Sequence, residues 1–129
     1  MTRQAVSTTG APGAVGPYSQ AIVTDGLVFC SGQVGLDPAT GELVSGGVEA
    51  EAVRVIRNLE AVLDAAGCTL ADVVKTTCFL ADIADFQKFN AVYAGFWPDP
   101  PPARSTFQVA ALPRGAQVEI EAIAVRNRG

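Results

Sequence analysis

The spacing of hydrophobic residues divides the first half of the chain into strands and a helix. Between Val48 and Ala66, apolar residues recur every three or four positions and charged residues lie between them. This spacing is typical of an amphipathic helix, and Gly67 stands where such helices commonly end. Apolar runs with few charges predict strands over residues 18–24, 27–33 and 73–80. Asp25-Gly26, between the first two runs, predicts a hairpin turn.

The second half predicts another helix and two more strands. Asp82 is a helix-capping residue type, and residues 83–97 carry aromatic side chains along one side, at Phe86, Phe89, Tyr93, Phe96 and Trp97. The prolines within 98–102 end this helix. Strands over 105–109 and 117–125 are expected to form a hairpin around 112–115. With one more strand expected before the first helix, the order is β-β-β-α-β-α-β-β, which predicts a single α+β domain over residues 1–129, with two helices on one face of one mixed sheet.

Composition agrees with one folded domain and changes the picture of its surface. The chain has 129 residues, of which 49% are hydrophobic and only 17% are charged, so a disordered chain is not expected. The mean hydropathy is positive, at +0.28. If both helices cover the same face of the sheet, the other face is apolar and needs cover. We therefore expect a homo-oligomer.

Charge and residue types exclude several classes of function. The chain contains no histidine, which excludes Ser-His-Asp and Cys-His triads and histidine-ligated zinc. A net charge of −4 argues against nucleic-acid binding. The three cysteines form no C-x-x-C pair and are expected to be buried free thiols, so no metal site is predicted. No apolar run is long enough to span a membrane and the N-terminal residues do not form a signal sequence, so a cytoplasmic location is expected.

Candidate chemistry lies in the last two strands. Glu119 and Glu121 alternate with apolar residues and therefore share one face of a strand. They could act in acid–base chemistry, or form a solvated edge or a structural ion pair. Arg104 follows the proline run and could hold a carboxylate or a phosphate, or be a surface arginine. Whether Arg104 and Glu119 share a face depends on the register of the strands, which the sequence leaves open.

Several motifs, in this order along the chain, resemble the RidA (YjgF) family of reactive-intermediate imine deaminases, also described as endoribonuclease L-PSP-like proteins. Pro102-Ala103-Arg104-Ser105 is the most specific of them. The others are Gly16-Pro17-Tyr18-Ser19-Gln20, Ser31-Gly32-Gln33, Asn58-Leu59, Val74-Lys75-Thr76-Thr77, Phe89-Asn90 and Val118-Glu119-Ile120-Glu121-Ala122. The resemblance covers nearly the whole chain.

This resemblance implies a chorismate-mutase-like subunit in a homotrimer with a barrel-like core and ligand clefts between subunits. It implies hydrolysis of 2-imino acids of the 2-aminoacrylate type to 2-oxo acids and ammonia, without a metal or cofactor. By position, Arg104 would grip the substrate carboxylate and Glu119 would position or activate the water. Five further residues would line the cleft: Tyr18, Ser31, Gly32, Asn90 and Thr106.

The chain departs from the family pattern in two places. Thr106 stands where the studied deaminases often have cysteine, and the loop over residues 98–102 is shorter and richer in proline, which bears on substrate size.

A non-catalytic trimer that binds small carboxylates is the main alternative function, although Glu119 would place a second negative charge in its cleft. A ribonuclease or translation inhibitor is disfavoured by the missing histidine and the acidic composition.

Overall fold

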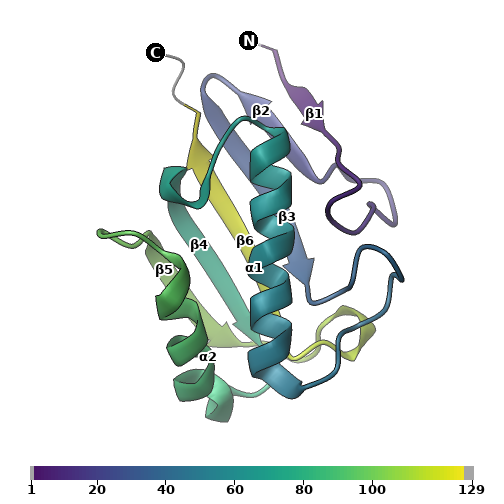
Figure 1. Ribbon diagram of the computed structural model, residues 1–129, viewed down its shortest axis with the longest axis vertical. Coiled ribbons are helices and arrows are strands. Elements are labelled where there is room, and N and C mark those ends of the chain that lie inside the picture. Colours follow the sequence, from purple (N-terminus) through teal and green to yellow (C-terminus); the bar gives the residue numbers. More distant parts are fainter. Residues whose placement is uncertain (1, 127–129) are drawn as a thin grey trace.

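One mixed sheet with two helices on one face makes up the structure, a computed structural model that describes residues 2–126 (Figure 1). The helices are α1 (Gly47–Ala65) and α2 (Phe86–Tyr93). The strands follow the order β1-β2-β3-β6-β4-β5 across the sheet, and only β4 and β5 run parallel. Their bounds are β1 (Gln4–Val6), β2 (Ala21–Thr24), β3 (Leu27–Val34), β4 (Val73–Leu80), β5 (Ala103–Gln108) and β6 (Val118–Val125). The predicted α+β class and element order are confirmed.

Local signals place the element ends. Asp25 and Gly26 have φ angles of 49° and 77°, as the tight turn between β2 and β3 requires. Gly67 follows α1 with φ 84°, a left-handed conformation that glycine adopts without strain. The Asp82 side chain accepts a hydrogen bond from the backbone N–H of Ala84. The second helix is shorter than the predicted span 83–97, because its ends, 83–85 and 94–96, are single 3₁₀ turns.

The hydrophobic core lies between the helices and the inner face of the sheet. Helix α1 contributes Val55, Ile56, Leu59 and Leu63, all fully buried, and packs on β3 and β6. Asn58 is also fully buried, and its side-chain N–H groups donate to the backbone carbonyls of Val34 and Leu36. This amide therefore ties α1 to the end of β3. Among residues 2–126, no helix is long and apolar enough to cross a membrane.

The strand order corrects one expectation. Strands β5 and β6 do not form a hairpin, because β4 lies between them and pairs with both. The physical reason is the helix between β4 and β5: a strand–helix–strand connection places its two strands parallel and side by side. Strand β6 then enters the remaining place between β3 and β4.

The face of the sheet opposite the helices is apolar and open in the isolated chain. Phe29 and Phe107 are 41% and 45% exposed there. Phe79 packs edge-on against Phe107, with ring centroids 5.3 Å apart, and Ile123 pairs with Phe29 across β3 and β6. The uncovered apolar face that the sequence predicts is therefore present, and a surface of this kind commonly binds another protein surface.

Candidate functional site

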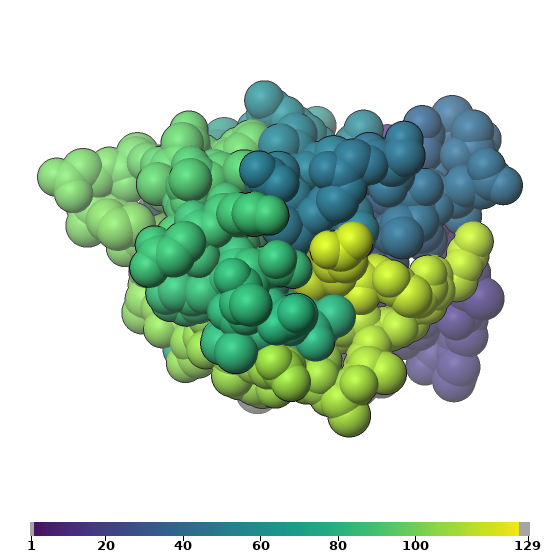
Figure 2. Space-filling view, turned by 90° about the horizontal axis from the view of Figure 1, so that it is seen from below, coloured from purple at the N-terminus to yellow at the C-terminus, as the bar shows by residue number. Residues whose placement is uncertain are grey.

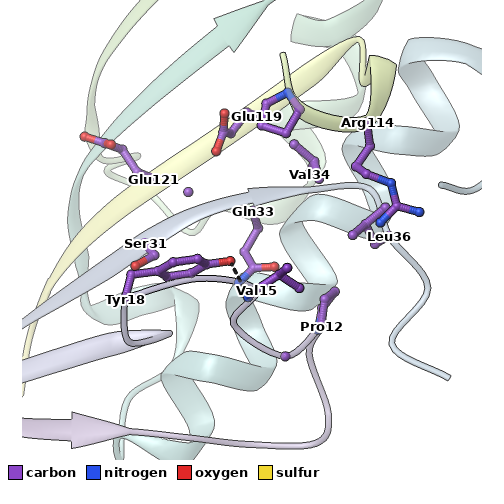
Figure 3. Close-up of a pocket in the computed structure, with 13 residues that line it drawn as sticks. Pro12, Val15, Tyr18, Ser31, Gln33, Val34, Leu36, Arg114, Glu119 and Glu121 are labelled. Carbon is purple, nitrogen blue, oxygen red and sulfur yellow. Dashed lines mark hydrogen bonds between the residues drawn. The ribbon is translucent and has the colours of Figure 1, made fainter. Parts of the chain in front are cut away.

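A cavity of about 610 Å³ opens on the uncovered side of the sheet, between the N-terminal loop, β3 and β6 (Figure 3). Five of the residues that the sequence singled out line it together: Tyr18, Ser31, Gly32, Glu119 and Glu121. In Figure 3 the side chains of Glu119 and Glu121 lie across the hollow from the ring of Tyr18, and Arg114 lies at its far end.

The carboxyl group of Glu119 lies directly over the backbone of Gly32. A Cβ atom at position 32 would overlap Oε2 of Glu119 and would lie 2.9 Å from its Cδ. Only glycine leaves room for this carboxylate. Burial raises the pKa of the Glu119 carboxyl, and the like charge of Glu121 raises it further. Glu119 therefore holds a proton more readily than an exposed glutamate does, which suits a group that both takes and returns one.

Two hydroxyl groups on the opposite wall differ in the hydrogen bond that each can still make to a ligand. The Tyr18 hydroxyl accepts a hydrogen bond from the backbone N–H of Val15, at 3.3 Å, so its own proton is free for a ligand. The Ser31 hydroxyl donates to the carbonyl of Ser19, at 2.6 Å, so only its lone pairs remain. This wall thus presents one donor, the Tyr18 hydroxyl, and one acceptor, the Ser31 hydroxyl, to the Glu119 carboxylate across the cavity.

Arg104 lies in a second recess, of about 380 Å³, between α2 and the proline-rich loop. Asn90, which the sequence also predicted to line the cleft, lines this recess beside Arg104. Tyr93 and Trp97 line it as well. Figure 2 shows the light-green loop projecting at one side of the molecule and the purple N-terminal segment at the other. The two hollows share no lining residue and are therefore separate in one chain.

The guanidinium group of Arg104 rests on aromatic rings and has no anionic partner. Its Cζ atom lies 4.8 Å from the ring centre of Tyr93, and 5.6 and 5.8 Å from those of Phe86 and Phe89. Within residues 2–126, its side chain makes no hydrogen bond and no ion pair. Such a half-buried cation, held by rings alone, keeps its N–H donors available for a carboxylate or a phosphate.

The register of the sheet places Arg104 and Glu119 on opposite faces. Arg104 pairs with Thr76 on β4, whose side chain is fully buried beneath the helices. Glu119 pairs with Phe79 on the open face. One chain therefore does not bring the two predicted catalytic residues together.

Thr106 lies outside the lining of both hollows. It follows Arg104 by two positions on β5 and pairs with Cys78, on the helix-covered face. Its hydroxyl oxygen is buried without a hydrogen-bond partner in the described chain. Its role as a cleft-lining residue stays a prediction.

Sequence reasoning missed two residues at these hollows. Tyr93 supports Arg104, and the available signal was the row of aromatic residues on the second predicted helix, combined with a strand–helix–strand unit that lays this helix beside β5. Arg114 lines the larger cavity and donates to the carbonyl of Gly41 at 3.1 Å. Its left-handed φ of 62° had no sequence signal beyond the neighbouring glycine and proline.

This fold is that of a known class of small α+β proteins. A putative endoribonuclease from Thermotoga maritima superposes with a TM-score of 0.93 at 50% identity, covering 97% of this chain and 98% of that one. Two curated relatives are named 2-iminobutanoate/2-iminopropanoate deaminase. The mouse protein is 55% identical over 97% of this chain and 93% of its own, and the human protein is 50% identical over 98% and 93%. The profile of the family described as Endoribonuclease L-PSP matches residues 8–126. The chain belongs to this family, which is the RidA family that its motifs resemble.

Proposed function

We propose that this protein is a hydrolytic deaminase of 2-imino acids, and that its active site forms where Arg104 of one subunit meets the Glu119 cavity of another. The observation that carries the proposal is the Arg104 guanidinium, which rests on three aromatic rings and makes no ion pair within residues 2–126. The names of the mouse and human relatives, at 55% and 50% identity, support the reaction type.

The substrate is a short 2-imino acid in its protonated form. Its two charged groups match the Arg104 recess of one subunit and the Glu119 cavity of another. Its carboxylate binds the guanidinium fork of Arg104, which is suited to two parallel hydrogen bonds. Its iminium N–H groups face the acceptors Ser31 and Glu119, and Tyr18 donates its free proton to the oxygen that forms at the reacting carbon. Asn90 and Gly32 shape the walls. Because the iminium carbon is already electrophilic, positioning and charge stabilisation are sufficient, and no cofactor is needed.

The reaction then follows from the raised pKa of Glu119. A water molecule adds to the iminium carbon while the Glu119 carboxylate takes one of its protons, which gives a carbinolamine. Glu119 returns that proton to the amino group. The C–N bond breaks with its electron pair on nitrogen, the carbinolamine oxygen becomes the carbonyl oxygen, and its proton leaves with ammonia as ammonium. The products are a 2-oxo acid and ammonium.

The assembly we propose is a homotrimer with the open faces of the sheets turned inward around a barrel-like core. The exposed apolar residues of that face support it, since Phe29 and Phe107 would be buried there. A cyclic arrangement gives every subunit a neighbour on each side. Each cleft then receives Arg104 from one copy and Glu119 from the next. The separation of the two residues on opposite faces of one sheet supports this division.

We also propose that the protein works in the cytoplasm. All three cysteines, Cys30, Cys68 and Cys78, are free and buried. Burial raises the pKa of the Cys30 thiol to about 12 and that of Cys78 to about 11, so both stay protonated and unreactive. A chain with free thiols and no disulfide among them suits a reducing compartment.

The test is the capture of imines before they react further. An amino-acid oxidase generates 2-iminobutanoate from the amino acid, semicarbazide traps it, and the deaminase lowers the trapped fraction. We expect the wild-type protein to lower trapping and Arg104→Ala to lose at least about 100-fold of this activity, since a charged contact is removed. Arg3→Ala, on the exposed N-terminal segment, is the control and should act as wild type. A folded wild-type protein without effect on any imine would contradict the proposal and favour a carboxylate-binding module.

A further inference from the structure

Arg104 is supported most closely by one ring, that of Tyr93. The guanidinium carbon lies 4.8 Å from the centre of this ring, nearer than the rings of Phe86 and Phe89. Tyr93 is itself held between two aromatic neighbours, with Phe89 of α2 at 5.4 Å and Trp97, beyond the end of the helix, at 5.1 Å between centroids. Of the three rings beneath Arg104, only Tyr93 carries a hydroxyl group.

That hydroxyl group is tied to the sheet. The Tyr93 hydroxyl and the Thr76 hydroxyl are 2.7 Å apart and both are buried. Thr76 lies on β4 directly opposite Arg104 on β5, and the two side chains share the helix-covered face. The contacts therefore form a closed path, from β4 through the Thr76 hydroxyl, the Tyr93 ring and the Arg104 guanidinium back to β5. Figure 1 shows α2, which carries Tyr93, lying alongside these two strands.

The path matters because a ring holds a cation without fixing its direction. The attraction between a guanidinium and a ring depends weakly on rotation in the ring plane, whereas a carboxylate requires two N–H groups in one orientation. A ring that is itself fixed by a hydrogen bond gives the guanidinium a fixed surface on which to lie. Burial raises the pKa of the Tyr93 phenol, so this group stays neutral and its hydrogen bond with Thr76 persists across the working pH range.

We propose that Thr76 and Tyr93 are positioning residues that hold the guanidinium of Arg104 ready for the substrate carboxylate. Neither residue touches the substrate; both act through Arg104. The inference rests on the proposed function to the extent that Arg104 binds a carboxylate. It adds that the strength of this binding is set by a hydroxyl pair behind the arginine.

The experiment measures binding of 2-oxobutanoate, the stable product, by titration calorimetry, together with kcat and KM in the trapping assay. Tyr93→Phe and Thr76→Val each remove one hydroxyl and keep the shape of the side chain. We expect each to weaken binding and raise KM by roughly three- to tenfold, as loss of one hydrogen bond does, while kcat stays within about twofold. The double variant should be no weaker than either single one, because either change already breaks the path. Thr76→Ser keeps the hydroxyl and should restore binding.

The control is Thr24→Val, the same substitution in strand β2 of the same sheet. The Thr24 hydroxyl oxygen is also buried but has no hydrogen-bond partner in the described chain, so its removal should leave binding and KM unchanged. Thermal unfolding of all variants shows that they are folded at the temperature of the titration. The Nε–H proton resonance of Arg104 adds a direct readout: it should move toward the value of a free arginine in Tyr93→Phe and Thr76→Val, and not in Thr24→Val.

The outcomes separate the two proposals. If wild type and Arg104→Ala bind 2-oxobutanoate equally, the carboxylate clamp itself is wrong, and with it this inference. If Arg104→Ala loses binding while Tyr93→Phe and Thr76→Val bind as wild type, the clamp stands and the positioning role is overturned. A fall in kcat with unchanged KM in both hydroxyl variants would also overturn it.

Discussion

Replacement of Gly32 by alanine tests whether the carboxylate of Glu119 must lie where the structure places it. The new Cβ atom would lie 2.9 Å from Cδ and 3.1 Å from Cγ of Glu119. Carbon atoms in contact are normally about 3.5–4.0 Å apart. The carboxyl group must therefore move by about 1 Å, away from β3 and toward the middle of the cavity.

The expected effect falls on catalysis and spares folding. A shift of about 1 Å at a reacting group costs up to about 100-fold in rate, so kcat should fall by roughly 10- to 100-fold. KM should change by less than about threefold, since Arg104 lies on the other face and keeps its grip. The free energy of unfolding should change by less than about 1 kcal/mol. The end of the glutamate side chain can turn aside, and alanine destabilises a strand less than glycine does.

The assay is the trapping of 2-iminobutanoate by semicarbazide, read over a range of substrate concentrations. Gly95→Ala is the matched control, since a Cβ at that position meets nothing within 4 Å and the variant should act as wild type. A Gly32→Ala protein with kcat within about twofold of wild type would refute the reasoning, because the reaction would then not depend on the place of this carboxylate.

Three further predictions follow from named contacts. Glu121→Gln removes the like charge that, second to burial, raises the pKa of Glu119. The pKa of Glu119 should therefore fall, and the acid limb of the kcat profile should move to lower pH because the base form persists there. Glu49→Gln on α1 should leave the limb in place, and an unmoved limb in Glu121→Gln would contradict the coupling. Asn58→Ala removes the donor to the carbonyl of Leu36, whereas the carbonyl of Val34 keeps the backbone N–H of Leu36. Chemical denaturation should therefore show a loss of about 1–3 kcal/mol, and a loss below about 0.5 kcal/mol would be inconsistent with this contact. Phe29→Glu places a charge on the open face of the sheet; sedimentation should show a smaller assembly than wild type, and an unchanged mass would argue that this face is not the interface.

The secondary structure could be predicted from sequence because its signals are local. The helix period in α1, the turn at Asp25-Gly26 and the stop at Gly67 each depend on neighbouring residues, and all three are present in the structure. Strand order is different, because it depends on which strands pair across the whole fold. The turn residues between the last two strands predicted a hairpin, which the strand order contradicts. The helix between β4 and β5 was the signal for their parallel pairing.

The candidate site was predicted residue by residue but not as an arrangement. The motifs point to Arg104 and Glu119, and both line hollows in the structure. Their placement on opposite faces could not be derived, since a shift of one residue in register would reverse the face of either strand. The support of Arg104 by Tyr93 depends on how the consecutive elements β4, α2 and β5 pack, for which the strand–helix–strand order was a signal. The hydroxyl contact between Tyr93 and Thr76 had no such signal, because it depends on the exact placement of two side chains.

Mixing two inactive variants tests most directly the claim that each active site takes Arg104 from one copy and Glu119 from another. Arg104→Ala and Glu119→Gln are each expected to be inactive alone. Unfolded together in equal amounts and refolded, they should form mixed trimers in which about a quarter of the clefts combine an intact Arg104 with an intact Glu119. Deaminase activity should therefore return to about a quarter of the wild-type level. A mixture that forms mixed trimers, shown by mass spectrometry, and stays as inactive as its components would contradict it.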